Sequence, residues 1–186
     1  MALHLEKAGH ELHLWARRPE SLKPFASVNA KTHASPAEVA KHAAVVITMV
    51  ADAPDVEAVC LGEHGIIAGG GKGLIVVDMS TINPNAARVI GQRLAEKGIE
   101  FVDAPVSGGE TGAINAALTV MAGGTQVAFD QVKPLLEKLG KSVTLIGGSG
   151  AGQVAKACNQ ILTGVGVLAV AEAFNFAAKS GVDPAK

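Results

Sequence analysis

Hydrophobic residues form short unbroken runs along this chain, and segments with helical apolar spacing separate the runs. The clearest runs are AAVVITMV at 43–50 and GLIVVDMS at 73–80. Both are typical of strands buried on both faces of a sheet. Further strands are expected at 11–18, near Val28, and at 99–109, 117–124 and 141–148.

Helices are predicted between these strands from apolar spacing and from end signals. Ser35–Pro36 is a good helix start, because Ser caps a helix and Pro fits its first turn. Other helical segments are expected at 1–9, 19–25, 51–60, 84–98 and 126–139. Strands that alternate with helices predict an α/β fold with a doubly wound, Rossmann-like, mostly parallel sheet.

The chain closes with a long, almost uncharged segment that is expected to form one helix from about Gly152 to Ser180. Lys156 and Asn159 are three residues apart and therefore share one face of it. A lysine at the mouth of an apolar helix is costly to desolvate unless it has a partner or a role. Spacing alone leaves two interpretations: a side chain that reaches out to water, or a proton donor in a cleft.

Topology suggests where a ligand would bind, because doubly wound sheets bind ligands outside the carboxyl ends of their strands. The expected strand ends are Arg17–Arg18, Met49 to Ala53, Ser80–Thr81, Ser107 to Gly109 and Gly147 to Gly150. The loops at these ends are expected to converge on one edge of the sheet.

The glycine clusters do not match a dinucleotide-binding turn. Such a fold normally begins with a strand, GxGxxG and a helix, and no such motif precedes residue 11. GGGKG at 69–73 comes before a strand and is interpreted as a surface turn. GGSGAG at 147–152 follows a strand and opens a helix, but no acidic-ended strand follows, so we interpret it as a hinge.

Composition excludes several functional classes. The net charge is −1 with no basic stripe, which argues against a nucleic-acid partner or an anionic membrane surface. Cys60 and Cys158 lack CxxC spacing and are expected to be buried free thiols of a reducing compartment. The histidines form no ligand pair, so no metal site is expected. The uncharged run 157–171 is too short and too polar for a membrane span, and a cytoplasmic protein is expected.

Four segments resemble the β-hydroxyacid dehydrogenase family of 3-hydroxyisobutyrate dehydrogenase-like proteins. They are MVADAPDVEAV (49–59), VVDMSTINP (76–84), FVDAPVSGGETGA (101–113) and GAGQVAKACNQIL (150–162). The resemblance implies an NAD(P)-binding Rossmann-like domain at 1–150 and a connecting helix at 151–186 that begins an all-helical domain. It also implies that the chain is shortened at both ends, since family members have a first strand and Gly-rich loop before the position of Met1.

The resemblance assigns roles to the residues around the expected ligand site. Lys156 matches the proton donor, and Asn159 would hold the substrate or orient the lysine. Ser107, Gly108 and Gly109 match the substrate loop, whose backbone N–H groups can cradle a carboxylate, although a plain turn has the same sequence.

The remaining matches are to the cofactor site. They are Arg17, Arg18, Met49, Val50, Ala51, Asp55 and Thr81. Asp55 could instead be a first-turn carboxylate that interacts favourably with a helix dipole, and Thr81 could instead cap a helix. Arg17 and Arg18 stand where an acidic residue would select NAD, so NADP(H) is expected to be preferred and NAD(H) possible. The alternative is a solvated arginine pair.

The implied activity is NAD(P)H-dependent reduction of a small carboxylate-bearing semialdehyde, such as tartronate semialdehyde to glycerate. Hydroxyisobutyrate, succinic semialdehyde and glyoxylate stay open as substrates of such an enzyme. Oxidative decarboxylases of the phosphogluconate type carry a His before the Asn, and the KACN segment lacks it. A different class also stays open: a non-catalytic fragment that binds nucleotide or dimerises. The apolar surface of the long helix predicts a homo-oligomer.

Overall fold

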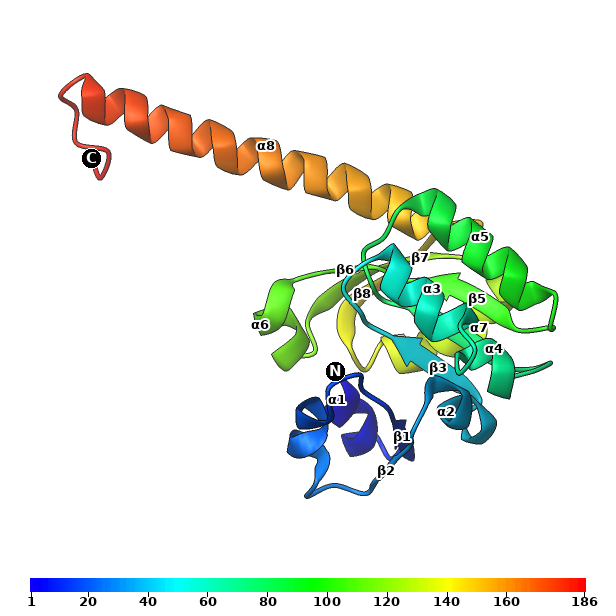
Figure 1. Ribbon diagram of the computed structural model, residues 1–186. Coiled ribbons are helices and arrows are strands. Elements are labelled where there is room, and N and C mark those ends of the chain that lie inside the picture. Colours follow the sequence, from blue (N-terminus) through cyan, green and yellow to red (C-terminus); the bar gives the residue numbers. More distant parts are fainter.

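The computed structural model describes all 186 residues as an α/β body from which one long helix projects (Figure 1). The strands are β1 (Leu12–Leu14), β2 (Ala30–Thr32), β3 (Val45–Thr48), β4 (Ile75–Asp78), β5 (Glu100–Asp103), β6 (Val106–Ser107), β7 (Leu118–Gly123) and β8 (Gly140–Gly147). The helices are α1 (Ala2–Lys7), α2 (Pro36–His42), α3 (Ala53–Leu61), α4 (Ile66–Gly69), α5 (Pro84–Ala95), α6 (Gly109–Ile114), α7 (Gln126–Leu136) and α8 (Ala151–Lys179), and a 3₁₀ helix, η1, covers Pro19–Phe25.

The main sheet has six strands in the order β3-β4-β5-β7-β6, with β8 added on β7. β3, β4 and β5 are parallel, and their last residues Thr48, Asp78 and Asp103 are in register. β7 runs antiparallel to β5 and β6 and parallel to β8, with Gly123 opposite both Asp103 and Gly147. The last residues of β4, β5, β7 and β8 therefore lie side by side, although β7 and β8 run opposite to β4 and β5.

Helices cover both faces of this sheet, which confirms the doubly wound α/β fold. On one face, α2 to α5 pack with β3, β4 and β5 around residues such as Val56, Ile66 and Leu94. On the other face, α7 places Phe129, Val132 and Leu136 against the sheet. The body is thus built from two apolar layers of the kind that a composition rich in Val, Leu and Ile predicts.

The strands β1 and β2 form a separate two-stranded sheet, which the sequence pattern did not indicate. The edge of β3 that β4 does not pair lines a groove of about 1150 Å³, and β1 lines the same groove. For this reason Val45 and Ile47 are only half-buried, and the expectation that 43–50 is buried on both faces is wrong. β1 is also shorter than expected, β2 lies beyond Val28, and α4 and α6 are helices too short for periodicity to reveal.

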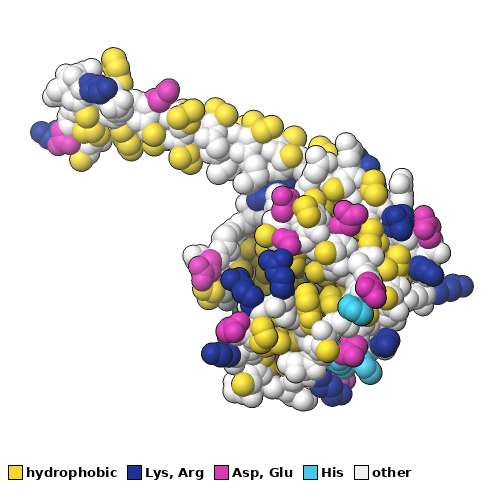
Figure 2. Space-filling view, viewed as in Figure 1, with side chains coloured by type: hydrophobic (Ala, Val, Ile, Leu, Met, Phe, Trp, Pro, Cys, Tyr) yellow, Lys and Arg dark blue, Asp and Glu magenta, His cyan; other side chains and the backbone are white.

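The helix α8 leaves the body after its first turns and carries apolar side chains along its free length (Figures 1 and 2). Its buried residues, Gly152, Gln153 and Lys156, all lie near its start. Cys158 is exposed because of this projection, so the prediction of burial holds for Cys60 and is wrong for Cys158. The whole helix, with a mean hydropathy of 1.7 in its most apolar stretch, is long and apolar enough to cross a membrane, unlike the run 157–171 alone. Core helices of soluble proteins meet the same criterion.

Candidate active site

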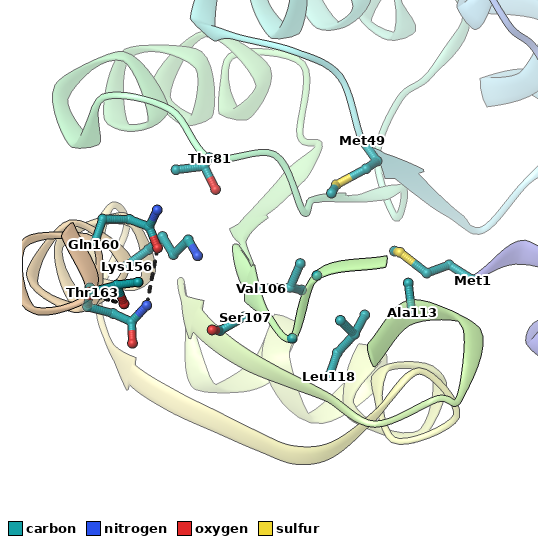
Figure 3. Close-up of a pocket in the computed structure, with 13 residues that line it drawn as sticks. Met1, Met49, Thr81, Val106, Ser107, Ala113, Leu118, Lys156, Gln160 and Thr163 are labelled. Carbon is teal, nitrogen blue, oxygen red and sulfur yellow. Dashed lines mark hydrogen bonds between the residues drawn. The ribbon is translucent and has the colours of Figure 1, made fainter. Parts of the chain in front are cut away.

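A cavity of about 330 Å³ lies between the first turns of α8, the β6–α6 loop and the loop after β4 (Figure 3). It is lined by Met1, Met49, Thr81, Val106, Ser107, Gly108, Gly109, Ala113, Leu118, Lys156, Asn159, Gln160 and Thr163. The structure thus brings the predicted catalytic residues, the predicted substrate loop and Thr81 together around one space. Their chemical roles remain predictions.

Lys156 reaches into this cavity from the second turn of α8. The residue is only 8% exposed, and its ammonium group forms neither a hydrogen bond nor an ion pair within the protein. Figure 3 shows the side chain pointing into the space between Thr81 and Ser107. Burial lowers the pKa of the ammonium from its usual value, because the charged form loses hydration. This geometry favours the cleft over a side chain that reaches bulk water.

A polar stripe continues along the same face of α8. Lys156, Asn159, Gln160 and Thr163 follow the i, i+3, i+4, i+7 spacing of one helix face. The Asn159 Nδ2 atom donates to Gln160 Oε1 at 3.2 Å, and Thr163 Oγ1 donates to the Asn159 carbonyl oxygen at 2.9 Å. Gln160 and Thr163 were missed in the sequence, although polar residues at helical spacing in an apolar helix are a readable signal.

The predicted substrate loop makes a sharp turn between β6 and α6. Gly108 and Gly109 have φ values of 132° and 61°, which are conformations that glycine adopts without steric cost. A side chain at Gly108 would also place its Cβ 3.2 Å from Leu118 Cδ2, which lies under the turn. The two glycines therefore let the backbone approach the cavity, where free N–H groups can face an anion.

Asp103 fixes the start of α8 against the sheet. Its buried carboxylate accepts hydrogen bonds from the backbone N–H of Gly150 at 2.6 Å and of Gln153 at 3.0 Å. Burial raises the pKa of this carboxyl to about 6, and the two N–H donors oppose the rise. A Cβ on Gly152 would lie 2.3 Å from the Met121 carbonyl oxygen, so α8 contacts the sheet edge closely at this point.

A second buried carboxyl, Asp78, ties together the loops after β3 and β4. Its Oδ1 accepts from Thr48 Oγ1 at 2.8 Å and from the Ser80 N–H at 3.2 Å. Ser80 Oγ in turn accepts from the Val50 N–H at 2.9 Å. Burial raises the pKa of Asp78, whose Oδ2 has no hydrogen-bond partner. Neither Asp78 nor Asp103 was singled out in the sequence, because each stands in an apolar strand with no spacing signal.

The other predicted cofactor residues line the groove between β1 and β3. Arg17, Arg18, Val50, Ala51 and Asp55 belong to this groove. Met1 and Met49 line both the groove and the smaller cavity, so an elongated ligand could extend from one to the other past these two side chains.

Two of these cofactor candidates bind each other. The Arg17 Nη1 atom lies 2.7 Å from Asp55 Oδ1, and the Arg17 side chain is 72% exposed. Arg18 forms no ion pair. The Arg17 charge is therefore partly compensated within the protein, whereas Arg18 is free to meet an anion.

Two protein-family models match the chain. Residues 1–147 match the NAD binding domain of 6-phosphogluconate dehydrogenase. Residues 150–186 match the NAD-binding region of NADP-dependent 3-hydroxyisobutyrate dehydrogenase.

Individual relatives and solved structures agree with these models. The chain is 41% identical over its full length to 2-hydroxy-3-oxopropionate reductase of Escherichia coli K12, and it covers 63% of that protein. It is 37% identical over its full length to 3-hydroxyisobutyrate dehydrogenase of Pseudomonas aeruginosa PAO1, and it covers 62% of that protein. The structure of Mycobacterium tuberculosis 3-hydroxyisobutyrate dehydrogenase with L-serine superimposes with a TM-score of 0.91 at 32% identity, over 97% of this chain and 61% of that one. The chain thus spans somewhat less than two thirds of these proteins.

Proposed function

This chain belongs to the β-hydroxyacid dehydrogenase family, and we propose that it reduces a small carboxylate-bearing semialdehyde to a hydroxy acid with NAD(P)H. Tartronate semialdehyde, which would give glycerate, is the substrate we favour, since the chain is 41% identical to a 2-hydroxy-3-oxopropionate reductase. The substrates of 3-hydroxyisobutyrate dehydrogenases are the nearest alternative, since several relatives carry that name.

One observation carries this proposal: Lys156 is only 8% exposed as a residue, and its unpaired ammonium faces the cavity that the Ser107–Gly109 loop also lines. A bound nicotinamide would supply the hydride. As negative charge grows on the substrate carbonyl oxygen, the Lys156 ammonium stabilises that oxygen and then donates a proton to it. The backbone N–H groups of Gly108 and Gly109 hold the substrate carboxylate, and Asn159 contacts the substrate beside the lysine.

Residues at both ends of the joined cavities fit a dinucleotide. Arg18 and the exposed Arg17 give the far end of the groove positive charge, which suits a 2′-phosphate, so we propose a preference for NADP(H) with NAD(H) possible. Val50 and Ala51 would line the adenosine half, and Thr81 would contact the nicotinamide side. No GxGxxG turn stands at the junction, where the N-terminal end of α1 lies instead.

Substitution of Lys156 tests the proposed role. Lys156→Ala should lower turnover of tartronate semialdehyde by about 10³-fold, within the range expected for loss of a positioned proton donor. The Kd of the Lys156→Ala variant for NADPH, measured by cofactor fluorescence, should differ from that of the wild type by less than about threefold. Lys179→Ala, at the opposite end of α8, is the matched control and should retain full turnover. Turnover of Lys156→Ala within a few fold of the wild type would refute the role.

The exposed apolar side chains along α8 favour a second candidate, a domain that binds nucleotide or pairs with another copy without turnover. The apolar length of α8 would be the pairing surface. The two proposed functions are distinguished by titrating NADPH and NADH and by assaying turnover on the same preparation. Saturable binding without turnover would select the second candidate, and binding of neither cofactor would refute the nucleotide site itself.

A further inference from the structure

We propose that Gln153 is a positioning residue, whose buried side-chain amide fixes the Ser80–Ile82 loop so that Thr81 is held opposite Lys156. The inference rests on the proposed function, because it assumes that Thr81 and Lys156 act at one site. We call the two hydrogen bonds of this amide to the loop the Gln153 bridge.

The Gln153 bridge consists of hydrogen bonds to the backbone on both sides of Thr81. The Nε2 atom of Gln153 donates to the Ser80 carbonyl oxygen at 2.8 Å, and its Oε1 accepts from the Ile82 N–H at 3.0 Å. Gln153 is 1% exposed, so water cannot replace either bond without entering the core. Thr81 itself is exposed, and its hydroxyl makes no hydrogen bond in the protein. The position of Thr81 is therefore set by its two neighbours.

The backbone of Gln153 is itself held in place against the sheet. The backbone N–H of Gln153 donates to the buried Asp103 carboxylate, and the neighbouring Gly152 leaves no space for a Cβ against the sheet. Lys156 follows three residues later on α8, on the same side as Gln153. One rigid helical turn thus carries both the proposed proton donor and the group that holds the loop across the cavity from it.

Glutamine is chemically suited to the bridge because it offers a donor and an acceptor on one side chain. A methionine of similar length offers neither. A glutamate keeps the acceptor when ionised and regains a donor only when it is protonated. These differences allow the positioning role to be separated from packing alone.

Ile82 amide exchange measures the bridge directly, without any ligand. Gln153→Met should accelerate hydrogen exchange of the Ile82 N–H by at least about 10-fold, because the acceptor is lost. The Met79 N–H, which donates to the Thr48 carbonyl oxygen, should keep its rate. Ser35→Ala, which removes the N-cap of the distant helix α2, is the matched stability control and should change neither rate locally. An unchanged Ile82 rate in Gln153→Met would overturn the bridge.

The kinetics of variants measure what the Gln153 bridge contributes to turnover. Gln153→Met should lower kcat by about 10- to 100-fold, since small displacements of positioned groups cost that much, while Ser35→Ala should not. Thr81→Ala should reduce activity in the wild type but have less than about a twofold effect in the Gln153→Met background. Gln153→Glu should recover activity relative to the wild type as pH falls, since the protonated acid restores the donor. Equal effects of Thr81→Ala in both backgrounds would overturn the proposal.

Failure of the proposed function would give different results from failure of the positioning role. A wild-type chain that neither binds NADPH or NADH nor reduces a semialdehyde would refute the function, and the Ile82 exchange would still decide whether Gln153 fixes the loop. A wild type that is active, combined with a Gln153→Met variant of unchanged kcat, would refute the positioning role alone.

Discussion

The ionisation of Asp103 should make the stability of the fold depend on pH. Its carboxyl is fully buried at the end of β5 and accepts the N–H groups of Gly150 and Gln153. Burial penalises the charged form more than these donors favour it, so the pKa rises from 3.8 to about 6. The folded chain therefore binds this proton more tightly than the unfolded chain does.

The sign and size of the effect follow from linkage. Between pH 3.8 and about 6 the native state binds more protons at this site than the unfolded state, so the free energy of unfolding falls as pH rises through that window. Each unit of pKa shift is worth about 1.4 kcal/mol. The full shift is thus worth about 3 kcal/mol, of which about 2 kcal/mol should be lost between pH 4 and pH 7.

Urea unfolding at pH 4, 5, 6 and 7 measures this contribution when the wild type is compared with Asp103→Asn. The variant loses hydrogen-bond strength at every pH but has no proton to release. Its free energy of unfolding should therefore rise by about 2 kcal/mol relative to that of the wild type from pH 4 to pH 7. Asp130→Asn, at an exposed position on α7, controls for the loss of a carboxyl. If Asp103→Asn instead lost stability relative to the wild type as pH rose, the two N–H donors would outweigh burial and the reasoning would be refuted.

Four further outcomes are expected. Burial lowers the pKa of Lys156, so the rate of reduction should begin to fall before the pH reaches 10.5 as pH is raised. A rate that stays constant through pH 10.5 would contradict the proton-donor role. Gly152→Ala should lower the free energy of unfolding by about 1–3 kcal/mol or more through the clash with Met121. Gly164→Ala, on the open part of α8, should raise helix stability by up to about 1 kcal/mol in the same denaturation assay. Burial also lowers the pKa of His13, so stability should fall as pH drops below 6.5, and less so in His13→Asn.

Features encoded by neighbouring residues were predictable from the sequence. The alternation of strands and helices, the start of α2 at Ser35, and the extent of α8 all follow from local spacing and capping. Lys156 and Asn159 were placed on one face by their separation alone. The segments that resemble the family also included every residue of the Ser107–Gly109 loop, which lines the cavity.

Features that depend on distant partners were not predictable. Asp103 and Gln153 looked like ordinary residues of a strand and a helix, because their partners are 47 to 73 positions away in the chain. The ion pair between Arg17 and Asp55 joins two cofactor candidates that the sequence treated as independent. The exposure of Cys158 likewise depends on how far α8 projects from the body.

The sequence by itself determined which side chains share a helix face and roughly where the main strands lie, since helical spacing and apolar runs are carried by neighbouring residues. Only the tertiary structure decided what Lys156 faces. Backbone hydrogen bonds to Asp103 and the close contact at Gly152 fix the start of α8 on the sheet edge. That docking turns a lysine on an apolar helix into an unpaired ammonium in a cavity, because burial and pairing are set by elements far apart along the chain.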